Sequence, residues 1–250
     1  MKRFLFLLIF ILAGCSSNSK EPHDPLESTN RKIYAFNSAV EKNIMRPVAK
    51  GYKAVAPSWF RKRITNFFRN IATPVIIFND ILQGEGTRAS ESLYRFMVNT
   101  TFGLGGTFDV AEEFAEVKYH SEDFGQTLAV WGIPEGPYIT VPFLYPMSTR
   151  ELTGKVVDIF LDPVYEEPPM KKLNTVERVG VGALDVFTAY AENTDKMEML
   201  EKSAMDPYAM TLSVLHQMRQ DEINNGEAKE ESTESYDFDM GDDDEEEDEE

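Results

Sequence analysis

The spacing of apolar residues is the feature that most constrains the fold of this chain. From residue 24 onward, apolar side chains recur every three or four residues through most of the sequence. That spacing is the period of an amphipathic helix. After the first 14 residues no apolar run approaches the roughly 20 residues that a membrane-spanning helix needs. The pattern therefore predicts amphipathic helices along most of the chain.

Prolines, glycines and capping residues set the predicted helix boundaries. Pro47 ends the first helix or lies just past it, Pro74 opens a new helix that Gly84 stops, and Ser148 with Glu151 forms a capping box. An extended piece is expected over 138–145. The predicted helical segments are 33–44, 57–71, 75–82, 89–97, 108–114, 124–131, 148–161 (ended by Pro163), 172–192 and 195–223, the last with a break at 206–208.

Residues 57–71 form the most distinctive amphipathic segment, because an aromatic stripe and a basic group share one helix. A basic amphipathic helix with aromatic residues can lie in a membrane interface. An ordinary surface helix packed on a core explains the same pattern equally well. The candidate membrane-interface residues are Trp59, Phe60, Arg61, Lys62, Arg63 and Phe67.

A second candidate site is the glycine-rich segment Gly103, Leu104, Gly105 and Gly106, followed by Asp109. Glycine adopts positive φ at little cost, so the segment predicts a tight turn between two helices. It could also act as a hinge, since hinges are a few residues that absorb the change in φ and ψ. Asp109 either caps a helix or lines a wet cavity. The glycine spacing does not match a phosphate-binding loop, and no strand precedes it.

The N-terminus resembles a bacterial lipoprotein signal. Lys2 and Arg3 precede an apolar run that ends in Leu-Ala-Gly-Cys15. Such a run is too short to span a bilayer and is typical of a secretory signal. A plain secretory signal is the alternative. Because Cys15 is the only cysteine, we expect it to carry the acyl lipid, including palmitate, and we expect no other cofactor. Ser16 resembles the outer-membrane sorting class.

Charge divides the chain into regions. The net charge is −18, of which residues 227–250 carry −14 and the signal +2, so the body carries −6. Nucleic acid is therefore excluded as a partner, since binding it needs a basic face. The expected regions are a signal peptide (1–14), a tether (15–23), a helical domain (24–226) and a disordered acidic tail (227–250).

No sequence pattern indicates catalysis or a metal site. The Gly-x-Ser-x-Gly motif of serine hydrolases is absent, and His23, His120 and His216 are far apart in sequence. Adjacent residues such as those in 120–123 rarely point at one centre, so a polar loop is expected there.

Several motifs, taken in order, resemble the outer-membrane lipoprotein family MlaA, also called VacJ. The resemblance covers about residues 24–226. It departs from the family pattern at 145–150 and after Asp206-Pro207-Tyr208, where the usual arginine is absent. The matching motifs are Asp24-Pro25-Leu26-Glu27, Asn30-Arg31, Arg46-Pro47-Val48, Pro74, Asn79, Leu82-Gln83-Gly84, Arg95-Phe96, Asn99-Thr100, 103–106 with Asp109-Val110-Ala111, 122–128, Trp131-Gly132, Gly136-Pro137-Tyr138, Pro142-Phe143 and 206–208.

The resemblance implies an all-α fold, in which a ring of amphipathic helices lies in the periplasmic leaflet of the outer membrane around a central polar pore. On this interpretation Gly103, Leu104, Gly105, Gly106 and Asp109 are candidate pore or hinge residues. It also implies that mislocalised phospholipid passes through the pore to a periplasmic MlaC-like carrier, and that the protein binds a trimeric porin. No covalent chemistry is needed for such transfer, so the resemblance implies no enzyme. Two alternatives are a scaffold lipoprotein that binds porins without moving lipid, and a lipid hydrolase, which the missing motif disfavours.

Overall fold

The computed structural model describes residues 22, 24–161 and 175–226, and these are almost entirely helical. A two-residue antiparallel hairpin is the only sheet among them, and Tyr138 pairs with Ser148 in it. The predicted all-α fold is confirmed. The elements are α2 (Glu27–Val40), the π-helical turn η1 (Glu41–Met45), α3 (Arg46–Val55), α4 (Ser58–Gln83), α5 (Gly86–Thr101), α6 (Val110–Ala115), α7 (Phe124–Val130), β1 (Tyr138–Ile139), β2 (Met147–Ser148), α8 (Thr149–Leu161), α9 (Thr175–Ser203) and α10 (Pro207–Ile223).

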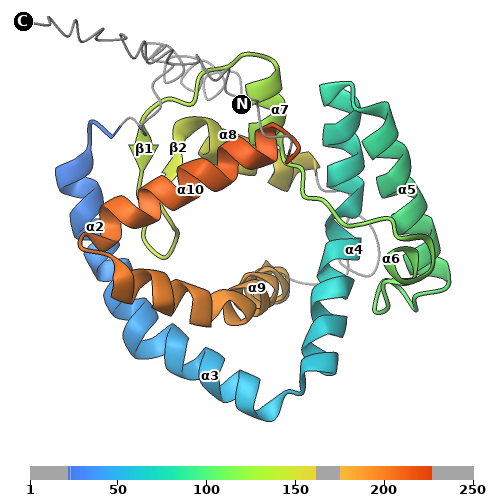
Figure 1. Ribbon diagram of the computed structural model, residues 1–250, viewed down its shortest axis with the longest axis horizontal. Coiled ribbons are helices and arrows are strands. Elements are labelled where there is room, and N and C mark those ends of the chain that lie inside the picture. Colours follow the sequence, from blue (N-terminus) through green and yellow to red (C-terminus); the bar gives the residue numbers. More distant parts are fainter. Residues whose placement is uncertain (1–21, 23, 162–174, 227–250) are drawn as a thin grey trace, which may run out of the picture.

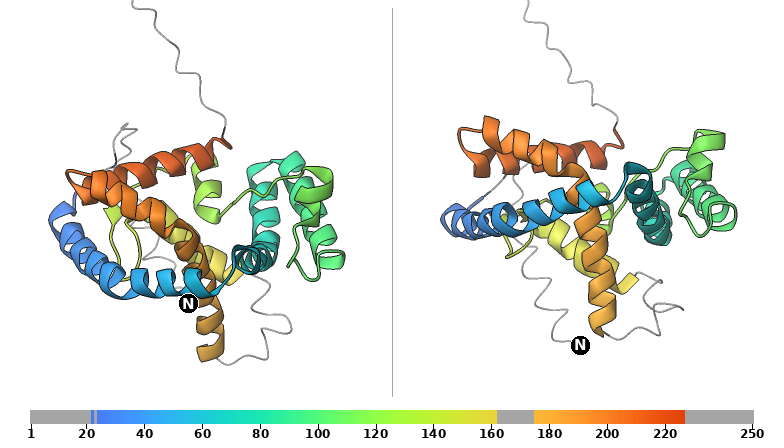
Figure 2. Two further views of the ribbon diagram at one scale, coloured as in Figure 1. Left: turned by 60° about the horizontal axis from the view of Figure 1, so that its bottom comes forward. Right: turned by 90° about the horizontal axis from the view of Figure 1, so that it is seen from below.

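The helices are arranged as a flat ring (Figure 1). Helices α2, α3 and α4 form one half of the ring, and α7, α8, the hairpin and α10 complete it, while α9 runs inside. Helix α5 lies against the outer side of α4, and α6 packs on α5. The first half of α9 projects from one face of the ring, and α10 lies along the other face (Figure 2). Within the described ranges, no helix combines the length and the apolar character needed to cross a membrane.

The predicted helix end near Pro47 is wrong. The chain continues as helix from α2 through η1 into α3, and Pro47 occupies the first turn of α3. The π turn explains this, because the amide of Arg46 bonds to the carbonyl of Glu41, five residues back. The α-helical hydrogen-bond pattern is already shifted where proline would interrupt it, so the missing proline donor costs little.

The predicted boundary at Pro74 is also wrong, since α4 runs through it for 26 residues. Packing of α4 on α5, the most extensive helix contact, holds both halves in line. The predicted stop at Gly84 is confirmed, and this residue has the left-handed φ of 83° that favours glycine.

Toward the C-terminus, the predicted break between 192 and 195 is wrong and the break at 206–208 is confirmed. Helix α9 is continuous because Asn193 and Thr194 bond the carbonyls four residues back rather than interrupting the helix. Asp206 caps α10 through the amides of Tyr208 and Ala209. Pro163 and residues 172–174 lie outside the described residues.

The capping box predicted at Ser148 is confirmed. The amide of Ser148 donates to the Glu151 carboxylate and the amide of Glu151 donates to the Ser148 hydroxyl, each at a distance of 3.2 Å. The extended piece predicted over 138–145 is only partly confirmed, because β1 ends at Ile139. The following loop is held instead by Asn37, which donates to the carbonyls of Val141 and Leu144.

A row of ion pairs joins η1, α3 and the start of α4 to α9. Residue numbers rise along α3 as they fall along α9, so the two helices run antiparallel. Tyr190 and Ala191 of α9 pack on Ala49 beneath these pairs. The pairs are Lys42–Glu201, Arg46–Glu201 (2.9 Å), Lys50–Glu198 (2.8 Å), Lys53–Asp195 (2.6 Å) and Arg61–Glu192 (2.6 Å).

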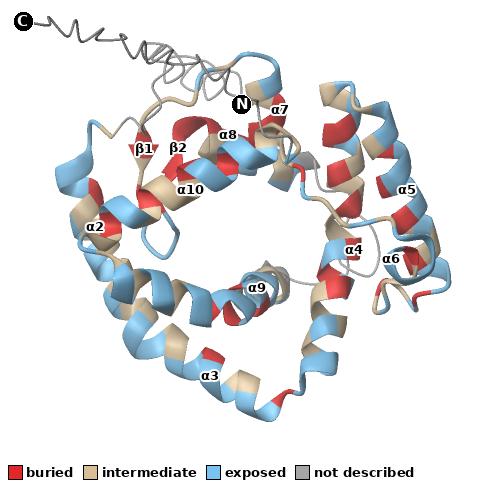
Figure 3. Cartoon of the chain, in the orientation of Figure 1, coloured by how far each residue is buried: buried red, intermediate tan, exposed pale blue. Residues whose placement is uncertain are grey.

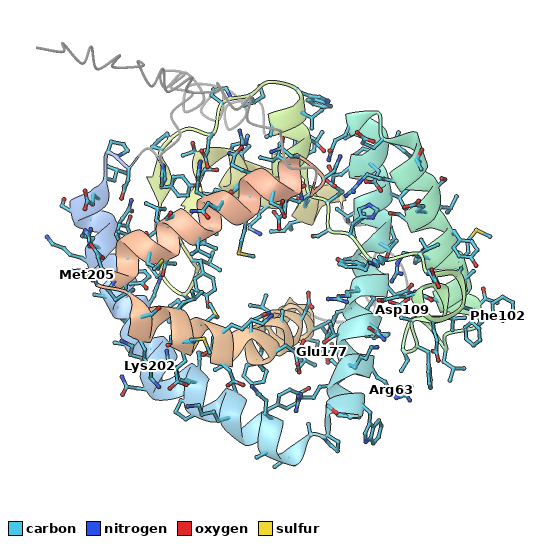
Figure 4. All side chains as sticks on the ribbon, viewed as in Figure 1. Arg63, Phe102, Asp109, Glu177, Lys202 and Met205 are labelled. Atoms are coloured by element: carbon cyan, nitrogen blue, oxygen red, sulfur yellow. The ribbon has the colours of Figure 1, made fainter. Side chains whose placement is uncertain are left out.

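The distribution of polar and apolar side chains is the reverse of that in most soluble domains. Among the described residues, 20 polar or charged residues are buried but only 12 apolar ones. Many large apolar side chains are exposed, including Phe102 (73%) at the outer edge of the molecule (Figure 4). Buried positions follow the facing sides of α4 and α5 (Figure 3). Contiguous exposed apolar surface marks an interaction with a membrane or a partner.

Candidate functional site

A buried ion pair lies beneath the glycine turn (residues 103–106) that joins α5 to α6. Arg95 donates to Asp109 at 2.6 Å, and Asn99 donates to the other carboxylate oxygen at 3.0 Å. Both charged side chains are at least nine-tenths buried. Asp109 also caps α6 through the amide of Glu112 and lies between α4 and α6 (Figure 4). The carboxylate therefore clamps the end of the turn to α5.

The charge of Arg95 controls the protonation of Asp109. Burial by itself would raise the pKa of this carboxyl group. The hydrogen bonds from Arg95 and Asn99, with the positive charge of Arg95, instead hold the pKa of Asp109 below its usual value. Asp109 is thus an ionised capping group in this site.

The glycine turn has the geometry of a tight turn. Leu104, Gly105 and Gly106 have φ values of 52°, 70° and 88°. Gly103 is needed for another reason, because a Cβ there would overlap the carbonyl oxygens of Phe108 and Asn99. A Cβ on Gly106 would overlap the side chain of Asn70. The predicted turn is confirmed by this geometry, and the hinge role stays a prediction.

A small polar cavity of about 10 Å³ adjoins the Arg95–Asp109 pair, which is enough for one water molecule. Arg69 lies at its edge, with its guanidinium carbon 4.7 Å from the centre of the Tyr119 ring. The lining residues are Asn66, Arg69, Asn70, Thr73, Arg95, Asn99, Asp109 and Tyr119.

A second polar cluster holds the segment between α6 and α7 against α4 and α5. His120 Nε2 lies 3.1 Å from Asp80 and 3.2 Å from the Ser92 hydroxyl. Arg88 pairs with Glu122 at 2.7 Å. Burial raises the pKa of Glu122, although hydrogen bonds from Gln83 and Arg88 oppose the effect. The cluster anchors the segment that crosses α4 (Figure 1).

Asp80, His120 and Glu122 place their ligand atoms within 4.8 Å of one another, so the group could hold a divalent ion. Arg88 already supplies a positive charge to both carboxylates, at 2.7 and 3.9 Å. This cation would repel a metal ion. The described contacts of the cluster are those of a structural ion-pair network.

The same cluster contains serine, histidine and aspartate, but not in the geometry of a catalytic triad. Ser92 and Asp80 both contact the same nitrogen of His120. A triad needs the base to contact the nucleophile through one ring nitrogen and the carboxylate through the other. Ser92 also donates to Asp80 directly at 3.0 Å. Of residues 120–123, only His120 and Glu122 share this centre, because Asp123 faces Arg219.

A third cluster joins the start of α7 to α8 and α10. Arg219 donates two hydrogen bonds to Asp123, at 2.8 and 2.9 Å, and lies 3.1 Å from Glu151. Burial alone would raise the pKa of Asp123, but the Arg219 guanidinium lowers it below the usual value. No local spacing in the sequence indicates this pair, which is separated by 96 positions.

The candidate interface residues on α4 point in different directions. Trp59, Phe60 and Phe67 are exposed at 60%, 44% and 39%. Arg61 faces inward and pairs with Glu192. Lys62 is exposed.

Arg63 stacks over Phe108, 3.7 Å from the ring centre, and so connects α4 to the segment before α6. A role for the α4 residues in membrane contact stays a prediction. Cys15, the signal, most of the tether and the acidic tail lie outside the described residues.

The model of the MlaA lipoprotein family matches residues 22–222 of the chain. The chain belongs to the MlaA lipoprotein family. It is 32% identical over 225 residues to the intermembrane phospholipid transport system lipoprotein MlaA of Haemophilus influenzae, covering 86% of this chain and 87% of that one. The MlaA lipoprotein of Escherichia coli is also 32% identical over 225 residues, covering 88% and 87%.

A solved structure, described as a structural basis for maintenance of bacterial outer membrane lipid asymmetry, superposes on this chain with a TM-score of 0.69. The sequences are 28% identical, and the match covers 80% of this chain and 99% of that one. The resemblance to MlaA inferred from the motifs is thereby confirmed.

The MlaA motifs of this chain pair with one another across the fold. Asn79 accepts from Thr127 at 2.8 Å, and Gln83 donates to Glu122 at 2.8 Å. Asn30 donates to the carbonyl of Tyr138 at 2.9 Å. The motifs thus supply the polar contacts that close the ring.

Proposed function

We propose that this protein is a lipid-anchored lipoprotein of an outer-membrane phospholipid transport system, one that maintains lipid asymmetry. Relatives that are 32% identical carry the name of such a system. The observation that carries the proposal is the reversed distribution of side chains, with polar residues buried and large apolar residues exposed. This distribution suits a protein that sits in hydrocarbon and offers lipids a polar route.

The physical barrier to lipid movement explains why such a route is useful. A phospholipid changes leaflets slowly because its charged head group must cross hydrocarbon, where charge is costly. A ring of helices with a polar interior lowers that cost without making or breaking a covalent bond. The proposed transport therefore needs neither a nucleophile nor a metal ion.

The proposal includes the location and partners of the protein. Acyl chains on Cys15 hold it at the periplasmic face of the outer membrane, and the ring lies in the inner leaflet. One acyl chain anchors only marginally, so stable attachment takes several. Outer-leaflet phospholipid passes through a central pore to a periplasmic MlaC-like carrier, and a trimeric porin holds the ring in place.

The test is the phospholipid content of the outer leaflet in cells with and without this protein. We expect phospholipid to accumulate in the deletion strain and to return to normal when the gene is restored. Normal content in the deletion strain, with porin binding retained by the purified protein, would favour the scaffold alternative. Release of fatty acid from labelled phospholipid would favour hydrolysis.

A further inference from the structure

Two arginines of α4, Arg63 and Arg69, have aromatic rings rather than carboxylates as partners. The guanidinium carbon of Arg63 lies 3.7 Å from the centre of the Phe108 ring, and that of Arg69 lies 4.7 Å from the centre of the Tyr119 ring. The other three described arginines of α4 and α5 each form an ion pair. Stacking on a ring face leaves the N–H groups at the edge of a guanidinium able to donate to an anion.

Two lysines extend this set of unpaired cations. Lys62 is exposed and lies on the same side of α4 as Arg69, since seven positions are close to two full turns, or about 10 Å. Lys118 is exposed and directly precedes Tyr119, on whose ring Arg69 stacks. Within the described residues, none of the four forms an ion pair. These four residues are termed the basic strip: Lys62, Arg63, Arg69 and Lys118.

The acids that lie nearest in sequence do not neutralise the basic strip. Asp109 pairs with Arg95 at 2.6 Å. Glu112, Glu113 and Glu116 are exposed, and in the described part of the chain none of them forms an ion pair with the strip. A row of positive charges without counter-charges attracts an extended anion that can meet several of them at once.

The same chain contains such an anion. Residues 227–250 carry a net charge of −14, and residues 242–250 are all acidic. They follow Gly226, with which the described structure ends just after α10. Helix α7 packs against both α10 and α4 (Figure 1). At its end Trp131 donates to the carbonyl of Leu82 on α4 at 3.0 Å. The acidic segment therefore leaves the ring close to the helix that carries most of the strip.

The length of the connection allows contact. Arg69 precedes Leu82 by 13 positions, which is about 20 Å along a helix. The first residue of the all-acidic run, Asp242, follows Gly226 by 16 positions. An extended chain covers about 3.3 Å per residue, so these positions span up to roughly 50 Å. The connection is thus long enough to cross α7 and still reach the basic strip.

We propose that the acidic residues 242–250 bind the basic strip of their own chain. Carboxylates accept paired hydrogen bonds from the edge of a guanidinium, and stacking on a ring already orients that edge. One exposed ion pair is weak, but several pairs on a tethered segment act together at a high effective concentration. An anionic lipid has no such tether. With the strip occupied, Lys62 and Arg63 are covered, and membrane contact of α4 depends on its exposed aromatic residues. This pairing is independent of lipid transport.

The experiment uses a carbodiimide cross-linker, which joins a carboxylate directly to a lysine amine where the two touch. The full-length acylated protein is treated in a non-ionic detergent and the products are identified by mass spectrometry. Lys62 and Lys118 should be joined to residues 242–250 about tenfold more than the control lysines. Cross-linking should fall in 1 M salt, which screens exposed charges. The controls, which are also exposed and have no ion pair in the described structure, are Lys32, Lys155 and Lys196.

The arginines are tested by substitution in the same full-length protein. Arg63→Gln with Arg69→Gln should lower the cross-linking of Lys62 about fivefold. Arg63→Lys with Arg69→Lys keeps both charges and should retain most of it. Lys32→Gln with Lys196→Gln is the matched control, and unchanged melting shows that each variant is folded.

A second measurement does not depend on the arginine variants. Changing every acid of 242–250 to its amide in the full-length protein should make Lys62 and Lys118 more reactive toward an acetylating reagent. The reactivity of Lys155 and Lys196 should stay the same.

Three results would overturn the pairing. Equal cross-linking of all five lysines would show that the acidic residues attract any exposed cation. Cross-links that join isotopically labelled to unlabelled copies would make a second copy the occupant. Protection of Lys62 from acetylation by phosphatidylglycerol vesicles, with no effect of the amide changes in 242–250, would assign the strip to anionic lipid instead.

Discussion

Asp109 and Arg95 illustrate how single residues support this ring. Both side chains are charged and buried, and they form an ion pair with each other. Asp109 also accepts a hydrogen bond from the amide of Glu112, and Arg95 donates one to the carbonyl of Val117. A buried pair of this kind adds little net stability when intact, because desolvation offsets attraction. Its value lies in fixing one arrangement of α5, the glycine turn and α6.

Replacing Asp109 by Asn should lower the free energy of unfolding by about 3 kcal/mol. This value is at the low end of the range for breaking a buried ion pair, because the neighbouring cavity has room for a water molecule. The loss arises because Arg95 stays buried without a counter-charge. Thermal unfolding measures it. Glu113→Gln, on the exposed side of α6, should change stability little.

The effect of Asp109→Asn should also depend on pH. The pKa of Asp109 is lower in the folded state than in the unfolded chain, where it is about 4. The pair therefore stabilises the fold fully above that value, and this contribution disappears as pH falls through the folded pKa. Unfolding curves at pH 7 and pH 3 should show a smaller difference between variant and wild type at pH 3. An equal difference at both would contradict the assignment.

The glycine turn yields a ranking of substitutions. Gly103→Ala should be the most damaging, because the new Cβ meets two backbone oxygens that cannot easily move. A Cβ on Gly105 meets no other atom, so Gly105→Ala should lower the free energy of unfolding only through its positive φ, by about 1 kcal/mol. Protein level and melting temperature check the ranking. A Gly105→Ala protein that folds normally but fails to clear outer-leaflet phospholipid would support a hinge role. Normal transport by this variant would mean that the segment acts only as a turn.

Among the elements, α3 and α9 are joined by charge as much as by apolar contact. Lys53→Glu should destabilise the protein by up to about 1 kcal/mol, since it replaces an attraction to Asp195 by a repulsion. The double variant Lys53→Glu/Asp195→Lys should recover most of the loss. Denaturant unfolding should show the effect shrinking in 1 M salt, which screens exposed charges. Lys196→Glu, which has no ion pair in the described structure, is the control; a similar loss there would argue against specific pairing.

The outcome for the elements shows what local sequence rules can and cannot predict. The capping box at Ser148, the stop at Gly84 and the start of α10 at Asp206 depend on contacts within a few residues, and the sequence predicts them. Pro47 and Pro74 mislead because tertiary packing and a π turn override the local preference of proline. The clusters around His120 and Arg219 join residues 40 and 96 positions apart, so no periodicity indicates them.

At the scale of the whole molecule, attachment to the membrane depends first on Cys15. Cys15→Ala removes the thiol that would accept the acyl chain, so we expect an unprocessed or mislocalised protein. Fractionation of cell envelopes and labelling with a fatty acid probe measure this. Ser16→Ala, which keeps the thiol, should remain lipidated. A Cys15→Ala protein that is still processed and labelled would contradict the lipoprotein assignment.

The orientation of the ring in the membrane can be tested apart from the anchor. Phe60, Phe67 and Phe78 are exposed on one side of α4, separated by 7 and 11 residues, which returns nearly to the same helix face. Fully burying a phenylalanine side chain contributes about 1.5–3 kcal/mol. These rings are 39–44% exposed, so each would contribute roughly 1 kcal/mol in hydrocarbon, and the three together a few kcal/mol of membrane affinity.

Changing all three to Gln in a non-acylated protein should therefore abolish its flotation with phospholipid vesicles. Its melting temperature should fall only modestly, because these rings are already 39–44% exposed in the folded protein. The matched control changes Met199, Met205 and Met218, which are more exposed than the three phenylalanines and lie on α9, on the connection between α9 and α10, and on α10. If both triple variants bind vesicles as the parent does, the aromatic stripe faces a protein partner or solvent rather than lipid.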